Sequence, residues 1–326
     1  MSLAKRVRRL LEEGSLNLPF PGSGHTNRRH WELAQIARDN LEIGRLVEAH
    51  TDALAILHEA GREPKPGAFY GVWASEGEQG LRMSERALSG QKGFCTGAGL
   101  VDCALVTAME PERRLLEIDL RIDRDRIFFD TSEWVTDAFA ETSTATTLFR
   151  DYPVSEADFV GRPSWYLERP GFWHGACGPA SCWAGGALGL IAYARKHTHS
   201  TNPHALAHLG ALLANEWQLR SLLQGAGAEI DRDFGNIPAA RLRALCLRHV
   251  VEQVCTDTML RFGRAFGPRP LAFDSAISRL YHDLSLYIRQ SHAESDLEEL
   301  GRLSARTWLG RRCKDDSRGA FAALAA

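Results

Sequence analysis

The spacing of hydrophobic positions changes twice along the chain, which divides it into three zones. In the first zone, apolar residues recur at helical spacing over residues 27–60, and Thr26 or Asn27 is a suitable N-cap. Gly61, Pro64 and Pro66 end the pattern. The first zone therefore predicts a single long helix.

In the second zone, between about residues 67 and 160, short runs of strand-forming residues alternate with turn residues. The predicted strands are 69–74, 93–95, 104–108, 115–122, 127–129 and 146–149. The run 115–122 alternates strictly, with Leu116, Ile118 and Leu120 on one face. The short spacing of these runs predicts a small antiparallel domain, shaped like a barrel or a sandwich.

Helical spacing returns in the third zone and continues to the end of the chain. The predicted helices are 180–197, 203–224, 239–266, 273–291 and a shorter one near 297–308. Asn202 and Pro203 form a good N-cap and first-turn pair, and small residues from Ala184 to Ala194 would let another helix approach closely. This zone predicts a helical bundle.

The order of the zones predicts an α+β fold in three parts. These are an N-terminal helical segment (residues 1–66), a small antiparallel β-barrel-like domain (67–165) and a C-terminal helical bundle (166–326). The sequence contains neither GxGxxG nor GxxxxGK[ST], so nothing in it supports a Rossmann or P-loop nucleotide site.

Composition narrows the class of protein. The formal net charge of −2 gives no support for binding nucleic acid or an anionic membrane. No apolar run suggests a signal peptide or a membrane span. The seven cysteines are scattered and lack CxxC spacing, which favours reduced thiols and a cytoplasmic location.

Several segments of the chain, in this order, resemble acyl-CoA dehydrogenases. In the second zone the segments that carry the resemblance are 73–76, 88–98, 102–108 and 141–146. In the third zone, Gly267–Leu271 resembles the Gly-Gly motif of the family, and Ser275–Leu284 its Arg-x-x-Arg-Asp helix. Pro170–Gly175 and the small-residue helix that follows also resemble the branch with flavin-dependent hydroxylase-like members.

The resemblance implies that FAD is held between the β-domain and the bundle, partly by a neighbouring subunit of a homodimer or homotetramer. By position, the isoalloxazine ring would be lined by Trp73, Ser75 and the run Phe94, Cys95 and Thr96. Gly267 and Arg269 would lie near the part of FAD reached across the dimer. Trp73 and Phe94 have an equally good alternative, which is packing in the strand core.

The glutamate that acyl-CoA dehydrogenases use as catalytic base has no clear counterpart in this sequence. The late loop reads Ser291-His292-Ala293-Glu294, without the Tyr-Glu-Gly run of the family. His292 and Glu294 are the candidate catalytic residues, since either side chain can be tuned towards neutral pH. His292 has a plain alternative as a solvated histidine at a helix end.

Three functions follow from these observations. The first is an FAD-dependent oxidoreductase of acyl-CoA dehydrogenase type that acts on a small substrate such as an acyl thioester. The second is a flavin-dependent monooxygenase served by a reductase or electron-transfer partner. The third is a non-catalytic binding or assembly protein with the same fold. No metal site is predicted, because His204 and His208 share a helix face but lack the glutamate of a metalloprotease motif.

Overall fold

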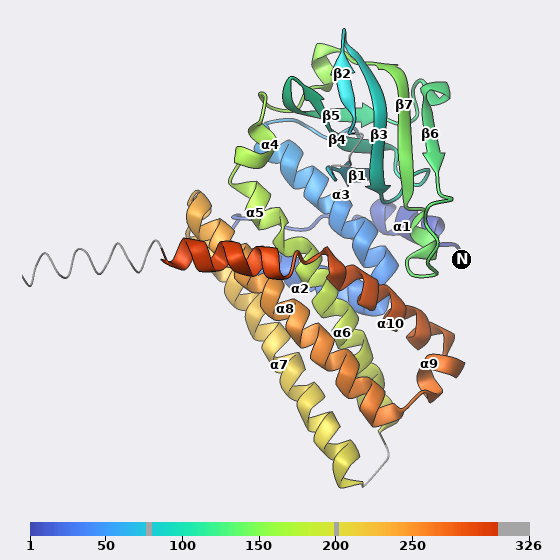
Figure 1. Ribbon diagram of the computed structural model, residues 1–326, viewed down its shortest axis with the longest axis vertical. Helices are drawn as coiled ribbons and strands as arrows, with labels where there is room; N and C mark the ends of the chain where they lie inside the picture. The colour runs from blue at the N-terminus through green and yellow to red at the C-terminus, as the bar shows by residue number, and fades with distance from the viewer. Residues whose placement is uncertain (76–79, 199–201, 306–326) are drawn as a thin grey trace, which may run out of the picture.

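The computed structural model describes residues 1–75, 80–198 and 202–305. A β-domain lies above a bundle of long helices, and helix α3 runs from one to the other (Figure 1). Of the helices within these ranges, none combines the length and apolar character needed to cross a bilayer. The predicted helix at 297–308 is helical over its described residues, and residues 306–308 lie outside them.

The N-terminal segment contains three helices where the sequence pattern predicted one. They are α1 (Leu3–Glu12), α2 (Thr26–Asp39) and α3 (Leu41–Glu59). Asn40 divides the predicted helix because its backbone is extended, at φ −162° and ψ 113°, and its side chain accepts a hydrogen bond from Ile43 N at 2.8 Å. Asn40 therefore ends α2 and caps α3.

The β-domain contains seven strands in one sheet. Their bounds are β1 (Tyr70–Trp73), β2 (Arg82–Ser84), β3 (Ala87–Cys95), β4 (Cys103–Glu110), β5 (Glu112–Asp119), β6 (Ile127–Asp130) and β7 (Ala145–Pro153). The order is β1-β4-β2-β3-β7-β6, and β5 pairs with β4 outside this path. The strand zone was thus placed correctly, except that the sequence analysis did not find β2.

The prediction of a purely antiparallel, barrel-like domain was wrong in two respects. First, β1 runs parallel to β4, with Tyr70 opposite Cys103, and β2 meets β4 in parallel at a single pair. Second, the described strands form a path with two ends and do not close into a barrel. A parallel pair requires a crossover connection, and here the chain forms the β2–β3 hairpin between β1 and β4. Alternating hydrophobicity alone does not reveal such a crossover.

The β2–β3 hairpin shows why β2 was missed. Its two-residue turn is Glu85-Arg86, and both residues have positive φ, 49° and 62°. Tight hairpins need this left-handed backbone and usually obtain it from Asn-Gly or Asp-Gly. Because two ordinary residues adopt this backbone here, no turn signal is visible in the sequence.

The bundle confirms most of the predicted helices. It contains α6 (Cys177–His197), α7 (Pro203–Arg232), α8 (Ile237–Phe266) and α10 (Ser275–Tyr287), and short helices α4 (Trp165–Glu168), α5 (Gly171–Gly175) and α9 (Arg269–Phe273) connect them to the rest. Asn202 caps α7 as predicted, through a 2.8 Å bond from His204 N. Helix α7 extends eight residues beyond the predicted end at 224.

Small residues on α6 bring the helices into close contact. A Cβ atom on Gly185 would clash with the backbone of α2 at Ala34, and one on Gly189 would lie 3.1 Å from Arg38 O. The predicted close approach of helices is thus confirmed, and α2 lies directly against α6.

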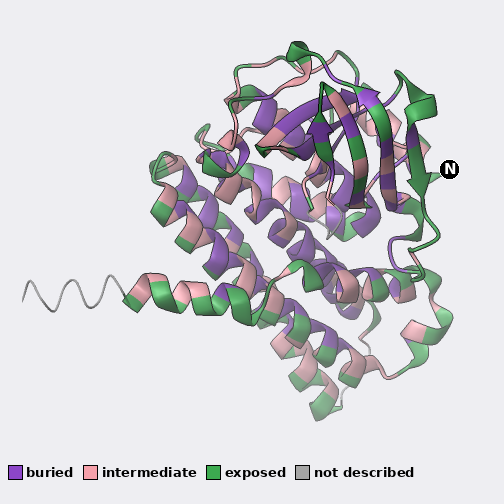
Figure 2. Ribbon diagram, turned by 45° about the horizontal axis from the view of Figure 1, so that its top comes forward, coloured by how far each residue is buried: buried purple, intermediate pink, exposed green. Residues whose placement is uncertain are grey.

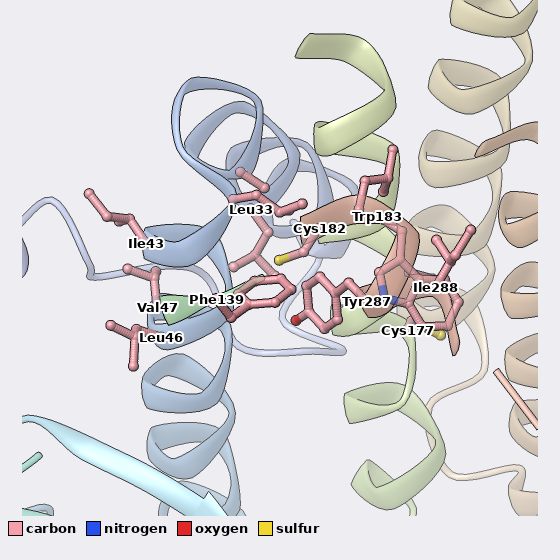
Figure 3. Packing of buried hydrophobic residues seen from close by; sticks show 14 of the residues in the cluster. Leu33, Ile43, Leu46, Val47, Phe139, Cys177, Cys182, Trp183, Tyr287 and Ile288 are labelled. Atoms are coloured by element: carbon pink, nitrogen blue, oxygen red, sulfur yellow. The ribbon is translucent and has the colours of Figure 1, made fainter. Parts of the chain in front are cut away.

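The two parts of the molecule share a continuous core. The buried residues form a band through the sheet and the helices (Figure 2). Phe139, from the loop between β6 and β7, packs beside Tyr287 of α10 with ring centroids 5.2 Å apart (Figure 3). The backbone N–H of Phe139 also donates to Asp283 of α10 at 2.7 Å. These contacts fix the β-domain against the bundle.

Candidate functional site

A cavity of about 660 Å³ lies where the β-domain meets the bundle. Its walls come from α3, from the ends of β1 and β3, from the β6–β7 loop, and from α8 and α10 with the turn after it. The lining residues are Arg45, Glu48, Ala49, Val72, Ala74, Ser75, Phe94, Thr96, Trp134, Arg248, Leu286, Tyr287, Arg289, Gln290 and His292. We call this space the interdomain cavity.

The β-domain wall combines an exposed aromatic ring with hydroxyl groups. Phe94 is 68% exposed and has a positive φ of 57°, an unusual conformation for a bulky residue. Ser75 and Thr96 stand beside it in the lining. The strand-core alternative for Phe94 is therefore wrong, since its ring faces the cavity. A strained aromatic residue held open in this way often marks a functional site.

Arg45 of α3 is the most buried charged residue of the lining, at 7% exposure. Its Nε and Nη2 donate to Thr96 Oγ1 at 3.1 and 2.9 Å. Its guanidinium group lies 4.8 Å from the Phe139 ring centroid and 5.3 Å from that of Tyr287. Desolvation lowers the pKa of Arg45 from its ordinary value. The aromatic faces hold the cation by cation–π attraction.

Arg248 of α8 supplies a second cation to the same cavity. It donates to Ala176 O at 3.1 Å and to Gln290 O at 2.6 Å, and it lies 4.8 Å from the Trp183 ring centroid. Desolvation lowers its pKa as well. Arg289 also lines the cavity, but it is largely exposed and forms an ion pair with Glu252 at 2.7 Å.

Among the described residues that line the interdomain cavity, Glu48 is the one carboxylate. Desolvation and the neighbouring Asp52 raise its pKa to about 8, while Arg29, Arg45 and Arg248 act in the opposite direction. The carboxyl group has room because Gly178 of α6 faces it, where a Cβ atom would lie 2.5 Å from Glu48 Oε1. A carboxyl group with such a pKa can give or take a proton near neutral pH.

Behind Glu48, two further acidic residues of α3 face glycines in the same way. Gly175 faces Asp52, where a Cβ would lie 2.6 Å from Oδ1, and Gly171 faces Glu59. Asp52 and Glu59 line a second cavity of about 340 Å³, together with Arg169. Arg169 forms an ion pair with Glu59 at 2.7 Å, and Gly171 N donates to the same carboxylate.

The predicted flavin-lining residues divide into two groups. Ser75, Phe94 and Thr96 line the interdomain cavity. Trp73 and Cys95 are buried in the core behind it, where Trp73 Nε1 donates to Thr96 O at 3.1 Å and Cys95 Sγ to Lys92 O at 3.3 Å. Trp73 and Cys95 thus support the wall of the cavity and do not form its surface.

The other predicted residues lie at the edge of the site or away from it. His292 lines the cavity at its rim, with a side chain 76% exposed and Nδ1 3.4 Å from Asp296. Glu294 is exposed and is not a lining residue of the described cavities. Gly267 ends α8 with a positive φ of 65°, and exposed Arg269 begins α9. Neither of these two lines the interdomain cavity.

Sequence reasoning missed the charged residues that dominate the cavity. Arg45, Glu48 and Asp52 follow a helical i, i+3, i+7 spacing within an otherwise apolar helix. Charged residues on the apolar side of a buried helix are costly, and that pattern was the available signal. Arg248 gave no such signal, because it is one of five arginines in its helix and nothing in the sequence sets it apart from the others.

The thiols and histidines of the described part of the chain lie apart from one another as far as metal ligation is concerned. No cluster of three or more potential metal ligands occurs there. Cys177 and Cys182 are free and buried, and burial raises the pKa of both thiols. Such thiols resist ionisation, and their burial suits a packing role.

Comparison with known proteins gives no match by sequence and clear matches by structure. No family model and no curated protein sequence matches the chain. TdsC from Paenibacillus sp. A11-2, in complex with FMN and indole, superposes with a TM-score of 0.70 at 17% identity, over 92% of this chain and 94% of TdsC. The methanesulfinate monooxygenase MsuC from Pseudomonas fluorescens gives 0.69 at 16% identity, over 94% and 97%.

Butyryl-CoA dehydrogenase from Megasphaera elsdenii superposes with a TM-score of 0.77 at 14% identity, over 92% of this chain and 90% of the dehydrogenase. The matched lengths include the helical segment, the sheet and the bundle together. At these identities the likeness concerns the fold. The chain therefore has the fold shared by acyl-CoA dehydrogenases and the related flavin monooxygenases, as the sequence motifs predicted.

Proposed function

We propose that this protein is a flavin-dependent oxidoreductase and that it binds the isoalloxazine ring of its flavin in the interdomain cavity, against Phe94. The observation that carries the proposal is the exposed Phe94 ring, on a backbone with positive φ, in a cavity that Ser75 and Thr96 also line. Both kinds of enzyme with this fold use flavin, and TdsC binds FMN in the same fold. FAD is the cofactor that the sequence motifs favour, and FMN is the alternative.

The residues of the cavity fit the chemistry of a flavin ring. A flavin needs flat apolar surface for its faces and a few donors for its polar edge. Phe94 and Trp134 offer aromatic surface, and Ser75 and Thr96 offer hydroxyl groups. When bound, the flavin would accept or supply the electrons of the reaction. Arg45 would hold the Thr96 hydroxyl in place through its two hydrogen bonds.

Dehydrogenation of a small substrate such as an acyl thioester is the first candidate reaction. It requires a base for the proton next to the carbonyl group. Glu48 takes the place of Glu294 in this role, because it lines the cavity and Glu294 does not, and no other described lining residue carries a carboxylate. Since the pKa of Glu48 is raised to about 8, activity of this kind should increase as pH rises through that value.

Monooxygenation is the second candidate, favoured by two of the structural matches and by the charge of the cavity. TdsC and MsuC are a dibenzothiophene and a methanesulfinate monooxygenase. The reaction consumes protons and needs no carboxylate base, so a protonated Glu48 suits it at neutral pH. It would also require reduced flavin from a partner reductase. A homodimer or homotetramer, with exposed Arg269 near a neighbour's cofactor, remains part of the proposal.

A flavin titration tests the proposal most directly. The purified protein is titrated with FAD, FMN and riboflavin, and binding is followed by the shift in flavin absorbance and quenching of its fluorescence. Phe94→Ala should weaken binding by roughly fivefold to tenfold, which is what loss of one aromatic stacking contact costs. Phe128→Ala, an exposed phenylalanine of β6 outside the cavity lining, is the matched control.

Two further results decide the reaction. Bleaching of bound flavin by butyryl-CoA without oxygen would support dehydrogenation, whereas oxygen consumption that depends on added reduced flavin would support monooxygenation. Protein that binds none of the three flavins would contradict the proposal and leave the non-catalytic alternative.

A further inference from the structure

Two arginines in the interdomain cavity carry charge that the described part of the protein leaves unbalanced. Arg45 is buried and Arg248 is half-buried. Among the ion pairs of the described residues, neither guanidinium has a carboxylate partner within 4.0 Å, whereas Arg289 in the same cavity has Glu252. An unpaired buried cation is costly, so its presence at a cavity wall suggests that a ligand completes it.

Each of the two guanidinium groups lies against one ring of an aromatic pair. Arg45 lies over Tyr287 and Arg248 over Trp183, and these two rings meet edge to face with centroids 6.2 Å apart. Tyr287 belongs to the cavity lining together with both arginines. The aromatic rings therefore fix the direction in which each cation presents its remaining donors.

Each of the two arginines has N–H groups that donate no hydrogen bond to the described residues. Arginine has five N–H groups. Arg45 directs Nε and Nη2 to one oxygen, Thr96 Oγ1, and its Nη1 has no partner among the described residues. Arg248 directs one bond from each Nη to a backbone carbonyl, Ala176 O and Gln290 O. The donors left over suit an acceptor with several oxygen atoms.

Glu48 lies within electrostatic reach of both arginines but does not balance them. Its neighbours are Arg45 and Asp52 on α3, Arg29 on α2 and Arg248 on α8; Cys182 of α6 and Tyr287 of α10 also face it. Burial raises its pKa to about 8, so the carboxyl group is mostly protonated at neutral pH. In that state it is a neutral O–H donor, which adds to the donors of the arginines.

We propose that Arg45 and Arg248 bind the oxyanion group of a small organic acid, with the Glu48 carboxyl group in the same cavity wall as a third polar contact. The oxyanion is a carboxylate, sulfinate or sulfonate carried by the substrate, and this assignment rests on the proposed flavin-dependent function. The phosphate of the flavin has the same chemistry and is the competing source. Protonated Glu48 cannot also be a base, so an anionic substrate favours the monooxygenase over the dehydrogenase.

Binding of butyrate and of its neutral isostere butyramide tests the proposal. Both are titrated calorimetrically at constant ionic strength, into the protein as purified and after saturation with FMN. Wild-type protein should bind butyrate at least tenfold more tightly than butyramide. Since a charge-assisted hydrogen bond is involved, Arg45→Gln and Arg248→Gln should each weaken butyrate binding at least tenfold.

Arg289→Gln is the matched control, because Arg289 lines the same cavity but is exposed and already paired. It should change butyrate binding by less than about threefold. Glu48→Gln keeps an N–H donor but no titratable proton, so it should bind butyrate less tightly than wild type at pH 7 and lose the further weakening that wild-type protein shows between pH 7 and 9. Thermal unfolding of each variant identifies loss of fold. If Arg45→Gln does not fold, the single variants Arg248→Gln and Glu48→Gln test the proposal.

Three results would overturn the proposal. Equal affinity for butyrate and butyramide would show that the site has no preference for an oxyanion. If Arg289→Gln weakens butyrate binding as much as Arg45→Gln and Arg248→Gln do, the effect comes from the overall positive charge of the cavity and not from two specific contacts. If the arginine variants weaken FMN but not riboflavin, the site belongs to the flavin phosphate. Absence of flavin binding would contradict the proposed function but not the oxyanion site, because butyrate is also titrated into the protein as purified, without added flavin.

Discussion

The two cavities along α3 differ in how their charges are balanced. In the smaller one, Arg169 is buried against Glu59 at 2.7 Å, and Gly171 N donates to the same carboxylate. In the interdomain cavity, Arg45 and Arg248 face a carboxyl group that is mostly protonated at neutral pH. Helix α3 thus supplies Glu59, one partner of a formed ion pair, to the smaller cavity, and Arg45, a cation without a carboxylate partner among the described residues, to the other.

The difference in charge balance indicates which arginines stabilise the fold and which are available to a ligand. A buried ion pair with extra hydrogen bonds stabilises the fold only while both partners remain, and removal of one leaves the other uncompensated. A buried cation without a partner has already incurred its desolvation cost, so its removal is cheap for the fold and expensive for a ligand. Mutation of the ion pair in the smaller cavity should therefore lower the free energy of unfolding, whereas mutation of the arginines in the interdomain cavity should mainly weaken ligand binding.

The largest effect is expected from Arg169→Met. It would leave the carboxylate of Glu59 buried without its partner, which costs about 3–5 kcal/mol of unfolding free energy. Arg45→Met should cost about 1 kcal/mol, because the loss of its cation–π and Thr96 contacts is offset by the removal of an unpaired buried charge. Urea unfolding of both variants checks this comparison, and equal losses would contradict it.

An intermediate effect is expected where a glycine of α6 faces backbone. Gly185→Ala would push a Cβ atom into Ala34 O of α2, and such overpacking costs about 1–3 kcal/mol. Gly178→Ala meets only the mobile carboxyl end of Glu48, and alanine favours the helix by about 1 kcal/mol, so its net change should stay within about 1 kcal/mol. Thermal unfolding of the two variants in one buffer separates them.

A smaller effect is expected from Glu48→Gln, and it depends on pH. The folded protein keeps the Glu48 proton up to about pH 8, whereas the unfolded chain loses it near the ordinary value of 4.5. The stability that this proton contributes is complete below about pH 4.5 and is lost as the pH rises through about 8. Glutamine stays neutral throughout. The variant should therefore gain about 1–2 kcal/mol over wild type at pH 9.

Denaturant unfolding at several pH values from 5 to 9 measures this difference. The gain should shrink steadily towards pH 5. Glu63→Gln, an exposed residue beyond the end of α3, provides the control curve and should follow wild type at every pH. A pH-independent difference for Glu48→Gln would show that Glu48 ionises as an ordinary surface carboxylate.

The sequence predicted the order of the zones well because each zone has a strong hydrophobic period. Its failures lie where a few residues decide the backbone locally. Asn40 is one polar residue among several, yet its extended backbone divides a helix. Glu85 and Arg86 form a tight turn without the residues that usually signal one. The parallel pairing of β1 and β4 is a long-range property that no local pattern carries.

The candidate site was only partly predictable for a related reason. Motif resemblance led to Ser75, Phe94 and Thr96, which share one wall of the cavity. It could not distinguish these from Trp73 and Cys95. Neighbouring residues of a strand normally point to opposite faces, but a β-bulge changes this alternation, and the sequence does not show where a bulge lies. The strand β3 has such a register shift between Lys92 and Cys95. The opposite wall, with Arg45, Glu48 and Arg248, is assembled from helices far apart in sequence.

The course of α3 has a consequence for how the molecule folds. Leu41, Leu46 and Val47 of its first half belong to the large core that the sheet and the bundle share, and Ile56 and Leu57 of its second half belong to a smaller core against β1, β4 and β5. Neither core is complete without this one helix. The predicted boundary at residue 66 therefore divides the sequence but leaves both cores dependent on α3. Unfolding should be a single cooperative event, in which the sheet and the bundle lose their order together.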